Sequence, residues 1–305
     1  MNNISKKQNE DDIIRMLQAQ SRAYTEAKNR QIIQYILIGL AMIMPVFAFF
    51  DFGVSTEEKE AAKSLLKNIL SIYGIVALLF VENMERLQKK CTLEAATIQE
   101  QIDTELFKLK WNDEITGKKI PKERIIALSQ KYKGKSMADW YENISPELDK
   151  NTATIMCQKI NIWWNAQDNK SWGKLIYLIT VLYYIVVFIA GLVVDMSLWD
   201  FTLTVFVPTL ALARFTQKFI NNQQDFAVSS KSLHAKVQTI IDKIESDNIN
   251  PSDTEIRKIQ NEIFKQRKRN DKVPDWYYKK QKKKREKIIN ATTLTTTKRV
   301  MKSEI

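Results

Sequence analysis

Glycine and proline are scarce in this sequence, which has 7 Gly and 6 Pro in 305 residues. Sandwiches and barrels need frequent turns, and turns depend on these two residue types. The few breakers are separated by long segments in which apolar residues recur at helical spacing. The sequence therefore predicts an all-α fold.

Cysteine and histidine are scarcer still. Cys91 and Cys157 form no CxxC pair, and we expect both to be reduced thiols. His234 is the one histidine, which excludes a histidine-rich metal site and most histidine-based catalysis. Glycine-rich phosphate loops and the GxSxG and HExxH motifs are also missing. We expect no enzyme activity, no metal and no resident cofactor, and a site built from carboxylates alone is the catalytic alternative.

Four long apolar runs stand out against this polar background. The third run has 20 residues without a charge, which at about 1.5 Å per residue just crosses a hydrocarbon core about 30 Å thick. The fourth run follows after a short turn and ends at Arg214. The sequence thus predicts two transmembrane hairpins, at 32–81 and 175–213, with spans at 32–50, 65–81, 175–194 and 198–213.

The distribution of Lys and Arg predicts the orientation. Residues 1–31, 82–174 and 214–305 contain 6, 16 and 22 basic residues, whereas the loops between paired spans contain only Lys59 and Lys63. Basic residues concentrate on the cytoplasmic side of a membrane. We therefore expect four membrane spans with both termini in the cytoplasm. A last run that enters the membrane again without crossing it is the main alternative.

The polar segments also show helical patterns. Residues 1–31 predict an amphipathic helix with Ile13, Met16, Leu17 and Tyr24 on one face. The insert 82–174 and the C-terminal segment 214–290 are expected to fold together into one helical cytoplasmic domain. The threonine-rich end, 291–305, is expected to be disordered.

Two local signals in the cytoplasmic segments are specific. Ser252 followed by Glu255 predicts a capping box at a helix start, with a buried face at Ile256, Ile259 and Ile263 beyond it. Apolar residues also recur every seven positions at Phe226, Leu233 and Ile240 with Ser230, Val237 and Ile244 interleaved, which favours a helix–helix seam.

Four segments occur together in an order that is specific. They read TIQEQIDTELFKLKWN (97–112), DWY (139–141), CQKINIWW (157–164) and IQNEIFKQRKRNDKVPDWYYKK (259–280). Together with four spans, they resemble the SMODS-associating four-transmembrane effector family of bacterial cyclic-oligonucleotide-based anti-phage signalling (CBASS).

The resemblance implies a role that residue patterns cannot show. Members of this family are thought to be membrane-disrupting effectors. A partner nucleotidyltransferase of the CD-NTase type makes a cyclic di- or oligonucleotide on infection, and the effector responds. The inner membrane then loses integrity, and the infection is aborted. The expected partners are thus the lipid bilayer, a cyclic nucleotide as activating ligand, the nucleotidyltransferase and further copies of the chain.

A nucleotide ligand needs aromatic planes for its bases and cationic or amide donors for its phosphates. For the tryptophans the alternative is a core or membrane-interface position, and for Gln99 and Asp103 it is a buried hydrogen-bonded pair. The candidate ligand residues are Gln99, Asp103, Trp111, Asn112, Trp140, Tyr141, Gln158, Asn161, Trp164, Arg257, Arg267, Arg269, Trp276 and Tyr277.

Polar and kinking residues within the spans are candidates for a pore or gate. Lys67 either lines a pore or extends to the outer interface. The basic run from Lys279 to Lys287 favours binding to anionic lipid over binding to nucleic acid. The pore or gate candidates are Lys67, Ser71, Pro45, Thr180, Pro208 and Thr209.

Two other functions remain open. One is a membrane-anchored interaction or scaffold module that recruits a partner without forming a pore. The other is a membrane-embedded enzyme, although the spans carry no paired acids or metal ligands that would support it.

Overall fold

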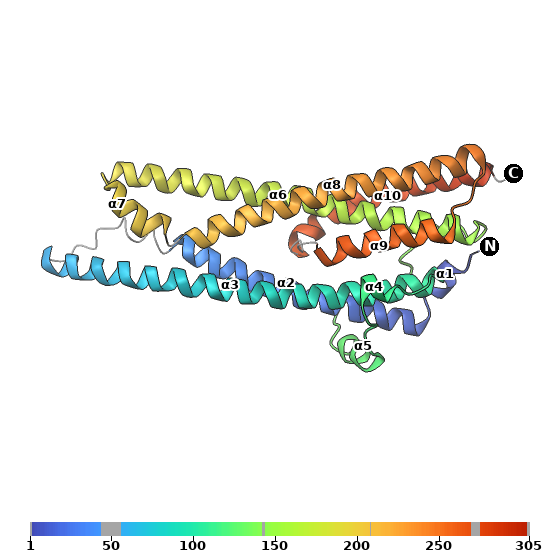
Figure 1. Cartoon of the computed structure of the whole chain (residues 1–305), viewed down its shortest axis with the longest axis horizontal. Coiled ribbons are helices and arrows are strands. Elements are labelled where there is room, and N and C mark those ends of the chain that lie inside the picture. The colour runs from blue at the N-terminus through green and yellow to red at the C-terminus, as the bar shows by residue number, and fades with distance from the viewer. Residues whose placement is uncertain (1, 44–55, 142–143, 208, 270–274, 304–305) are drawn as a thin grey trace. The chain divides into compact units, whose positions relative to one another are not determined.

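The computed structural model describes residues 2–43, 56–141, 144–207, 209–269 and 275–303. All regular structure in these ranges is helical, which confirms the predicted all-α class (Figure 1). The elements are α1 (Ile4–Lys7), α2 (Asp11–Ile43), α3 (Thr56–Leu106), α4 (Asp113–Thr116), α5 (Lys122–Ser129), α6 (Lys150–Val193), α7 (Leu198–Phe201), the π-helix η2 (Thr202–Phe206), α8 (Leu210–Asp247), α9 (Asp253–Arg269) and α10 (Asp275–Ser303).

The chain divides into two compact units. Unit 1 comprises Met1–Lys28, Lys89–Lys170 and Gln224–Ile305, and unit 2 comprises Asn29–Gln88 and Ser171–Gln223. The helices α2, α3, α6 and α8 each contribute residues to both units. Each of these four helices therefore links the packing of unit 1 covalently to that of unit 2.

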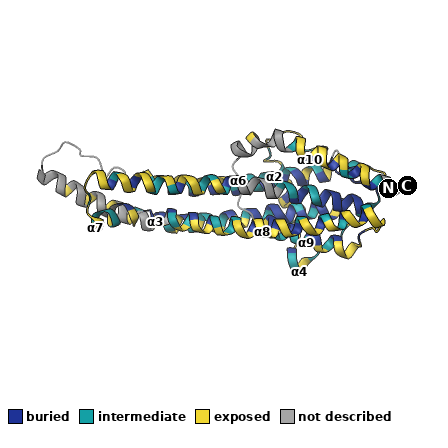
Figure 2. Cartoon of the chain, turned by 90° about the horizontal axis from the view of Figure 1, so that it is seen from above, coloured by how far each residue is buried: buried dark blue, intermediate teal, exposed yellow. Residues whose placement is uncertain are grey.

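Unit 1 has an extensive apolar core. Ile13, Met16 and Leu17 of α2 are buried on the face that their spacing predicts. They belong to one cluster with Ile98 and Ile102 of α3. Figure 2 shows the buried residues concentrated in the helices of this unit. Burial of matched apolar faces is the main force that holds such helices together.

A second cluster joins α6, α8 and α9. Its members are Leu233, Val237 and Ile241 of α8, Ile256, Ile259 and Ile263 of α9, and Ile155 and Ile162 of α6. The heptad pattern is thus confirmed, except that Ile241 is fully buried where Ile240 is only partly buried. An α-helix drifts from a strict seven-residue repeat because it has 3.6 residues per turn.

The capping box is present at the start of α9. The Glu255 amide donates to Ser252 Oγ at 3.2 Å, and the Ser252 amide donates to the Glu255 carboxylate at 3.0 Å. The Ser252 hydroxyl also donates to this carboxylate at 2.9 Å, and the two bonds from Ser252 to the carboxylate lower the pKa of the Glu255 carboxyl. The sequence therefore predicted this helix start correctly.

The predicted disorder of 291–305 was wrong for the residues that the structure describes. Helix α10 continues to Ser303, and it buries Ile289, Thr293, Thr297 and Val300 at spacings of four, four and three. Thr297 Oγ1 lies 3.9 Å from the Met156 sulfur. Composition missed this because the threonine methyl groups supply part of the buried stripe, while the hydroxyl groups bond to carbonyls one turn earlier.

In unit 2, the third apolar run forms a continuous helix. Trp172–Val193 of α6 has a mean hydropathy of 2.5 and is the one stretch, within the described ranges, that is long and apolar enough by itself to cross a membrane. Residues 44–50 of the first predicted span, with Pro45, lie outside the described residues. In the second span, residues 65–81 belong to α3.

The fourth run is not one continuous α-helix. It begins with α7, widens into the π-helix η2, where the Val207 amide donates to the Thr202 carbonyl at 2.9 Å, and resumes as α8 at Leu210. A proline at position 208 has no amide hydrogen, so an unbroken α-helical ladder cannot pass through this sequence. The position of Pro208 itself lies outside the described residues.

Candidate functional site

Two carboxylates are buried on α3 in unit 1. Glu100 and Asp103 lie one turn apart with relative exposures of 0% and 3%. A buried charge is costly unless it is paired and hydrogen-bonded. The position of this pair therefore depends on partners that other helices supply.

Helix α9 supplies those partners from one face. Arg257 Nη2 lies 2.5 Å from Glu100 Oε1, and Arg267 Nη1 lies 2.6 Å from Asp103 Oδ2. Between the two arginines, Gln260 Nε2 donates to Glu100 at 2.7 Å and to Asp103 at 2.9 Å. The amide thus links the two ion pairs into one network.

Helix α6 completes this network. Gln158 Nε2 donates to Gln260 Oε1 at 3.0 Å and to the Ile256 carbonyl at 3.1 Å. The buried polar network is defined here as Glu100, Asp103, Gln158, Arg257, Gln260 and Arg267. It favours one register of α3, α6 and α9 within unit 1, because these hydrogen bonds and ion pairs form only in this alignment.

The network places its charges in an environment of low polarity. Burial raises the pKa of the Glu100 carboxyl, and the adjacent Asp103 raises it further, against the opposing influence of Arg257. Burial would lower the pKa of Arg267, but Asp103, Tyr24 and Glu100 together outweigh this effect and raise that pKa. Arg267 is therefore a permanent buried cation, whereas Glu100 can take up a proton.

Glu100 is expected to give unit 1 a pH-dependent stability. A carboxyl with a raised pKa in the folded state binds its proton more tightly there, so its contribution to stability is present below the ordinary value of 4.5 and is lost as the pH rises through the folded pKa. The free energy of unfolding of the wild type relative to Glu100→Gln should fall as the pH increases. Denaturant unfolding of the full-length protein in detergent, between about pH 4 and 8, measures this difference.

The matched control for this prediction is Glu114→Gln, which removes an exposed glutamate from α4. It separates the loss of a buried carboxylate from the general effect of one charge. The prediction is contradicted if the free energy of unfolding of the wild type, minus that of Glu100→Gln, increases as the pH rises.

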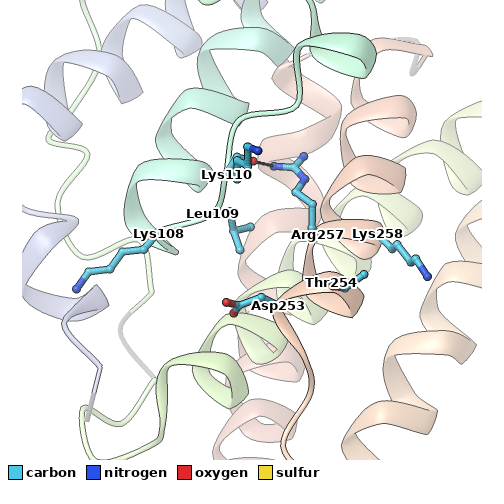
Figure 3. Close-up of a pocket in the computed structure, with 7 residues that line it drawn as sticks. All are labelled: Lys108, Leu109, Lys110, Asp253, Thr254, Arg257 and Lys258. Atoms are coloured by element: carbon cyan, nitrogen blue, oxygen red, sulfur yellow. Dashed lines mark hydrogen bonds between the residues drawn. The ribbon is translucent and has the colours of Figure 1, made fainter.

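A basic pocket of about 400 Å³ adjoins the network. It is lined by residues of the segment that follows α3 and of the first turns of α9 (Figure 3): Lys108, Leu109, Lys110, Asp253, Thr254, Arg257 and Lys258. The Arg257 guanidinium is shared between the pocket and the network. Its Nη1 donates to the Lys110 carbonyl at 3.2 Å, and its Nη2 contacts Glu100.

Four of the candidate ligand residues predicted from the sequence lie together in the network: Asp103, Gln158, Arg257 and Arg267. Sequence reasoning missed Glu100 and Gln260. A signal for both was present, because the spacing of four, three and four that marks a buried stripe runs through Ala96, Glu100 and Asp103 of α3 to Phe107, the first residue after it. The same spacing runs through Ile256, Gln260, Ile263 and Arg267 on α9.

Other candidates have separate local roles. The Gln99 side chain accepts from Tyr24 at 3.1 Å, and Asn161 donates to the buried Tyr141 hydroxyl at 2.9 Å. The Trp111 indole donates to the Gly117 carbonyl at 3.0 Å and has Lys119 Nζ 5.3 Å from its ring centroid. These contacts join neighbouring parts of unit 1, and none of them includes a residue of the network.

The remaining ligand candidates are scattered. Asn112 precedes α4, and its carbonyl accepts from the hydroxyl of Thr116, the last residue of that helix. Trp140 is 49% exposed, and Trp164 packs edge-on against Trp163. Arg269 is exposed at the end of α9. The side chains of Trp276 and Tyr277 lie outside the described residues, as do most side chains of the basic run 279–287.

Two pore or gate candidates are described in unit 2. Thr180 Oγ1 lies 3.1 Å from Thr216 Oγ1 and also donates to the Ile176 carbonyl, while the Thr209 hydroxyl donates to the Val205 carbonyl. Both threonines are buried. The side chains of Lys67 and Ser71 lie outside the described residues, like Pro45 and Pro208.

Within the described ranges, no group of three or more His, Cys, Asp or Glu side chains is placed to hold a metal ion. The carboxylates of the network face arginine and glutamine donors instead. A network of this kind can hold helices in register and can respond when one partner is drawn away.

Comparison with known proteins identifies the family of this chain. The SMODS-associating 4TM effector domain matches residues 2–295. A curated protein of Bacillus cereus (strain VD146), described as a probable CBASS effector molecule, is 25% identical over 276 residues, which cover 89% of this chain and 90% of that protein. No solved structure gives a significant match. Because the match extends over almost the entire chain, this protein belongs to the SMODS-associating 4TM effector domain family.

Proposed function

We propose that this protein is a non-enzymatic CBASS effector that permeabilises the bacterial inner membrane when a cyclic nucleotide binds to unit 1. A partner nucleotidyltransferase supplies the nucleotide on infection, and loss of membrane integrity aborts the infection. The proposal draws on membership of the family, on the similarity to a probable CBASS effector and on the apolar surface of unit 2.

The observation that carries the membrane role is the exposure of α6 in unit 2. Only 17% of its most apolar window is buried within the protein. Its large side chains are half or more exposed at Tyr177, Leu178, Leu182, Val186, Phe188, Ile189, Leu192 and Val193. Apolar surface costs roughly 25 cal/mol per Å² in water, so lipid or further copies of the chain must cover this helix.

Among its described residues, unit 2 has an apolar cluster separate from those of unit 1. Ile38, Val81 and Leu212 form its buried cluster. Tyrosine hydroxyls make further links between helices, since Tyr73 donates to the Leu37 carbonyl at 2.8 Å and Tyr183 to the Met42 carbonyl at 2.9 Å. A ligand that favours another arrangement of these helices shifts the population toward that arrangement.

We also propose the four-span topology with both termini in the cytoplasm. The support is the excess of basic residues in 1–31, 82–174 and 214–305 over the short loops between the spans. In this arrangement all of unit 1 faces the compartment in which the cyclic nucleotide is made.

Liposome leakage tests the proposed function. Full-length protein is reconstituted into vesicles that contain a self-quenched dye, and cyclic di- and oligonucleotides are added one at a time. We expect several-fold faster dye release with at least one of them than with a linear dinucleotide. If no member of a broad panel increases leakage, nucleotide-dependent permeabilisation is wrong.

A membrane-anchored module that recruits a partner without forming a pore is the second candidate. It is favoured by the small number of polar side chains on the described spans. One of them, Thr180, donates to the Ile176 carbonyl and lies beside Thr216, so it is satisfied within unit 2. Under this function the membrane potential of cells stays constant after activation, whereas permeabilisation collapses it.

A further inference from the structure

The basic pocket in unit 1 carries more positive charge than its own contacts require. Four cations line it, Lys108, Lys110, Arg257 and Lys258, against the single carboxylate of Asp253 among the described lining residues. Asp253 is already 3.5 Å from Lys150. Among the residues that the structure describes, no carboxylate lies within ion-pair distance of Lys108, Lys110 or Lys258. This cluster of cations would be stabilised by an anionic ligand.

We infer that this basic pocket binds a phosphodiester group of the activating cyclic nucleotide and that Arg257 transmits the binding to the buried polar network. The inference rests on the proposed function and adds a site to it. The pocket volume of about 400 Å³ lies within the range of small-molecule sites, about 300 to 1,000 Å³. It accommodates part of a cyclic nucleotide, so the rest of the ligand extends over the surface.

Local structure holds the walls of the pocket in place. Lys108 has a positive φ of 53° where α3 ends, and the Leu109 amide donates to the Thr104 carbonyl at 2.9 Å. This ending turns the chain so that residues 108–110 lie against α9, and the bond from Arg257 to the Lys110 carbonyl fixes them there. Figure 3 shows Lys108 and Lys258 at opposite edges of the pocket.

The opposite wall favours an anion for a second reason. Asp253 and Thr254 belong to the first turn of α9, a helix of 17 residues. The amide groups at a helix start carry a partial positive charge. Flexible lysines at the edges can turn toward a bound phosphate, while the planar Arg257 offers two parallel donors to its oxygens.

Arg257 gives the pocket a connection to the core of unit 1. Its guanidinium donates to Asn261 at 2.8 Å, to the Lys110 carbonyl and to Glu100. A phosphate that draws the guanidinium outward weakens the contact with Glu100 and thereby the Gln260 bridge to Asp103. The network joins α3 and α6, and both helices continue into unit 2. Binding can in this way favour a different packing of these helices.

Direct binding tests the inference on full-length protein in detergent. The nucleotide used is whichever member of the cyclic panel the wild type binds or responds to with leakage. Lys110→Glu/Lys258→Glu should weaken its affinity by about 100-fold, because two charged contacts become repulsive. The matched control is Lys231→Glu/Lys236→Glu, which makes the same charge change at exposed lysines of α8 and should bind like the wild type. Asp253→Asn should bind more tightly than the wild type.

Arg257→Lys separates binding from its transmission. Lysine keeps the charge but cannot hold Glu100, Lys110 and a phosphate together. We expect this variant to bind the nucleotide within about 10-fold of the wild type and to lose nucleotide-dependent leakage. Thermal melting of every variant identifies any that are unfolded.

Two outcomes overturn the inference while the proposed function stands. One is wild-type affinity in Lys110→Glu/Lys258→Glu. The other concerns lipid binding without nucleotide. If that variant binds phosphatidylglycerol vesicles more weakly than the wild type does, binds phosphatidylcholine vesicles equally well and keeps its nucleotide affinity, the pocket holds the phosphodiester of a lipid. If no cyclic nucleotide binds to the wild type or causes leakage, the proposed function itself fails.

Discussion

Replacing Arg267 with Ala is expected to lower the free energy of unfolding of unit 1 by about 3 to 5 kcal/mol, the usual cost of removing one partner of a buried ion pair. Arg267 and Asp103 side chains have relative exposures of only 2% and 4%, and their charged atoms are 2.6 Å apart. Without the guanidinium, the Asp103 carboxylate keeps the donor Gln260 but loses its compensating charge. Denaturant unfolding of the full-length protein in detergent, followed by circular dichroism, measures the change.

The control for this prediction is Arg269→Ala, the same substitution two residues further along α9 at an exposed position. It should change stability by no more than about 0.5 kcal/mol. The double variant Asp103→Leu/Arg267→Met should lose much less stability than Arg267→Ala, because a buried pair replaced on both sides leaves no unpaired charge. Equal losses in Arg267→Ala and Arg269→Ala would show that the pair does not stabilise unit 1.

Placing two aspartates on the exposed face of α6 is expected to prevent this helix from crossing the membrane. Val186 and Ile189 are 63% and 53% exposed within the most apolar stretch of the chain. One aspartate at the centre of a span costs about 2.5 to 3.5 kcal/mol, so Val186→Asp/Ile189→Asp disfavours insertion by about 5 to 7 kcal/mol. The variant should therefore also lose nucleotide-dependent leakage.

The measurement uses a reporter cysteine at Val194, which follows α6 and is 51% exposed. In a background without Cys91 and Cys157, the reporter should react with an impermeant maleimide added outside spheroplasts. The aspartate pair should abolish that reaction. The matched control is Val228→Asp/Ile249→Asp, which makes the same changes at side chains of unit 1 that are 72% and 57% exposed, and it should leave labelling unchanged. Equal labelling of both pairs would show that α6 does not span the membrane.

Much of the local structure could be predicted from the sequence. The buried faces of α2, α3 and α9 follow from apolar residues at helical spacing, and the start of α9 follows from Ser252 and Glu255. These features depend on neighbours within a few positions, so the pattern contains the information needed. The family resemblance likewise depended on short segments and was confirmed by the match over residues 2–295.

Local patterns failed where a segment depends on distant partners. The tail was expected to be disordered, yet α10 packs Val300 into the main cluster of unit 1. The fourth apolar run was expected to form one span with Pro208 as a candidate kink, yet its backbone already changes to a π-helix at η2, before that position. Hydropathy averages over a window, so it cannot detect a change in the hydrogen-bond register of the backbone.

By itself, the sequence determined an all-α chain with apolar and basic segments that are sharply separated, because helical periodicity and hydropathy are local properties of the residues. Only the tertiary structure decided which of the polar residues meet. Arg257, Gln260 and Arg267 contact Glu100 and Asp103 across 157 to 164 positions of sequence, and this pairing also forms the edge of the basic pocket. No local pattern specifies such a match, because a buried charge selects its partner by the complete packing of the helices around it.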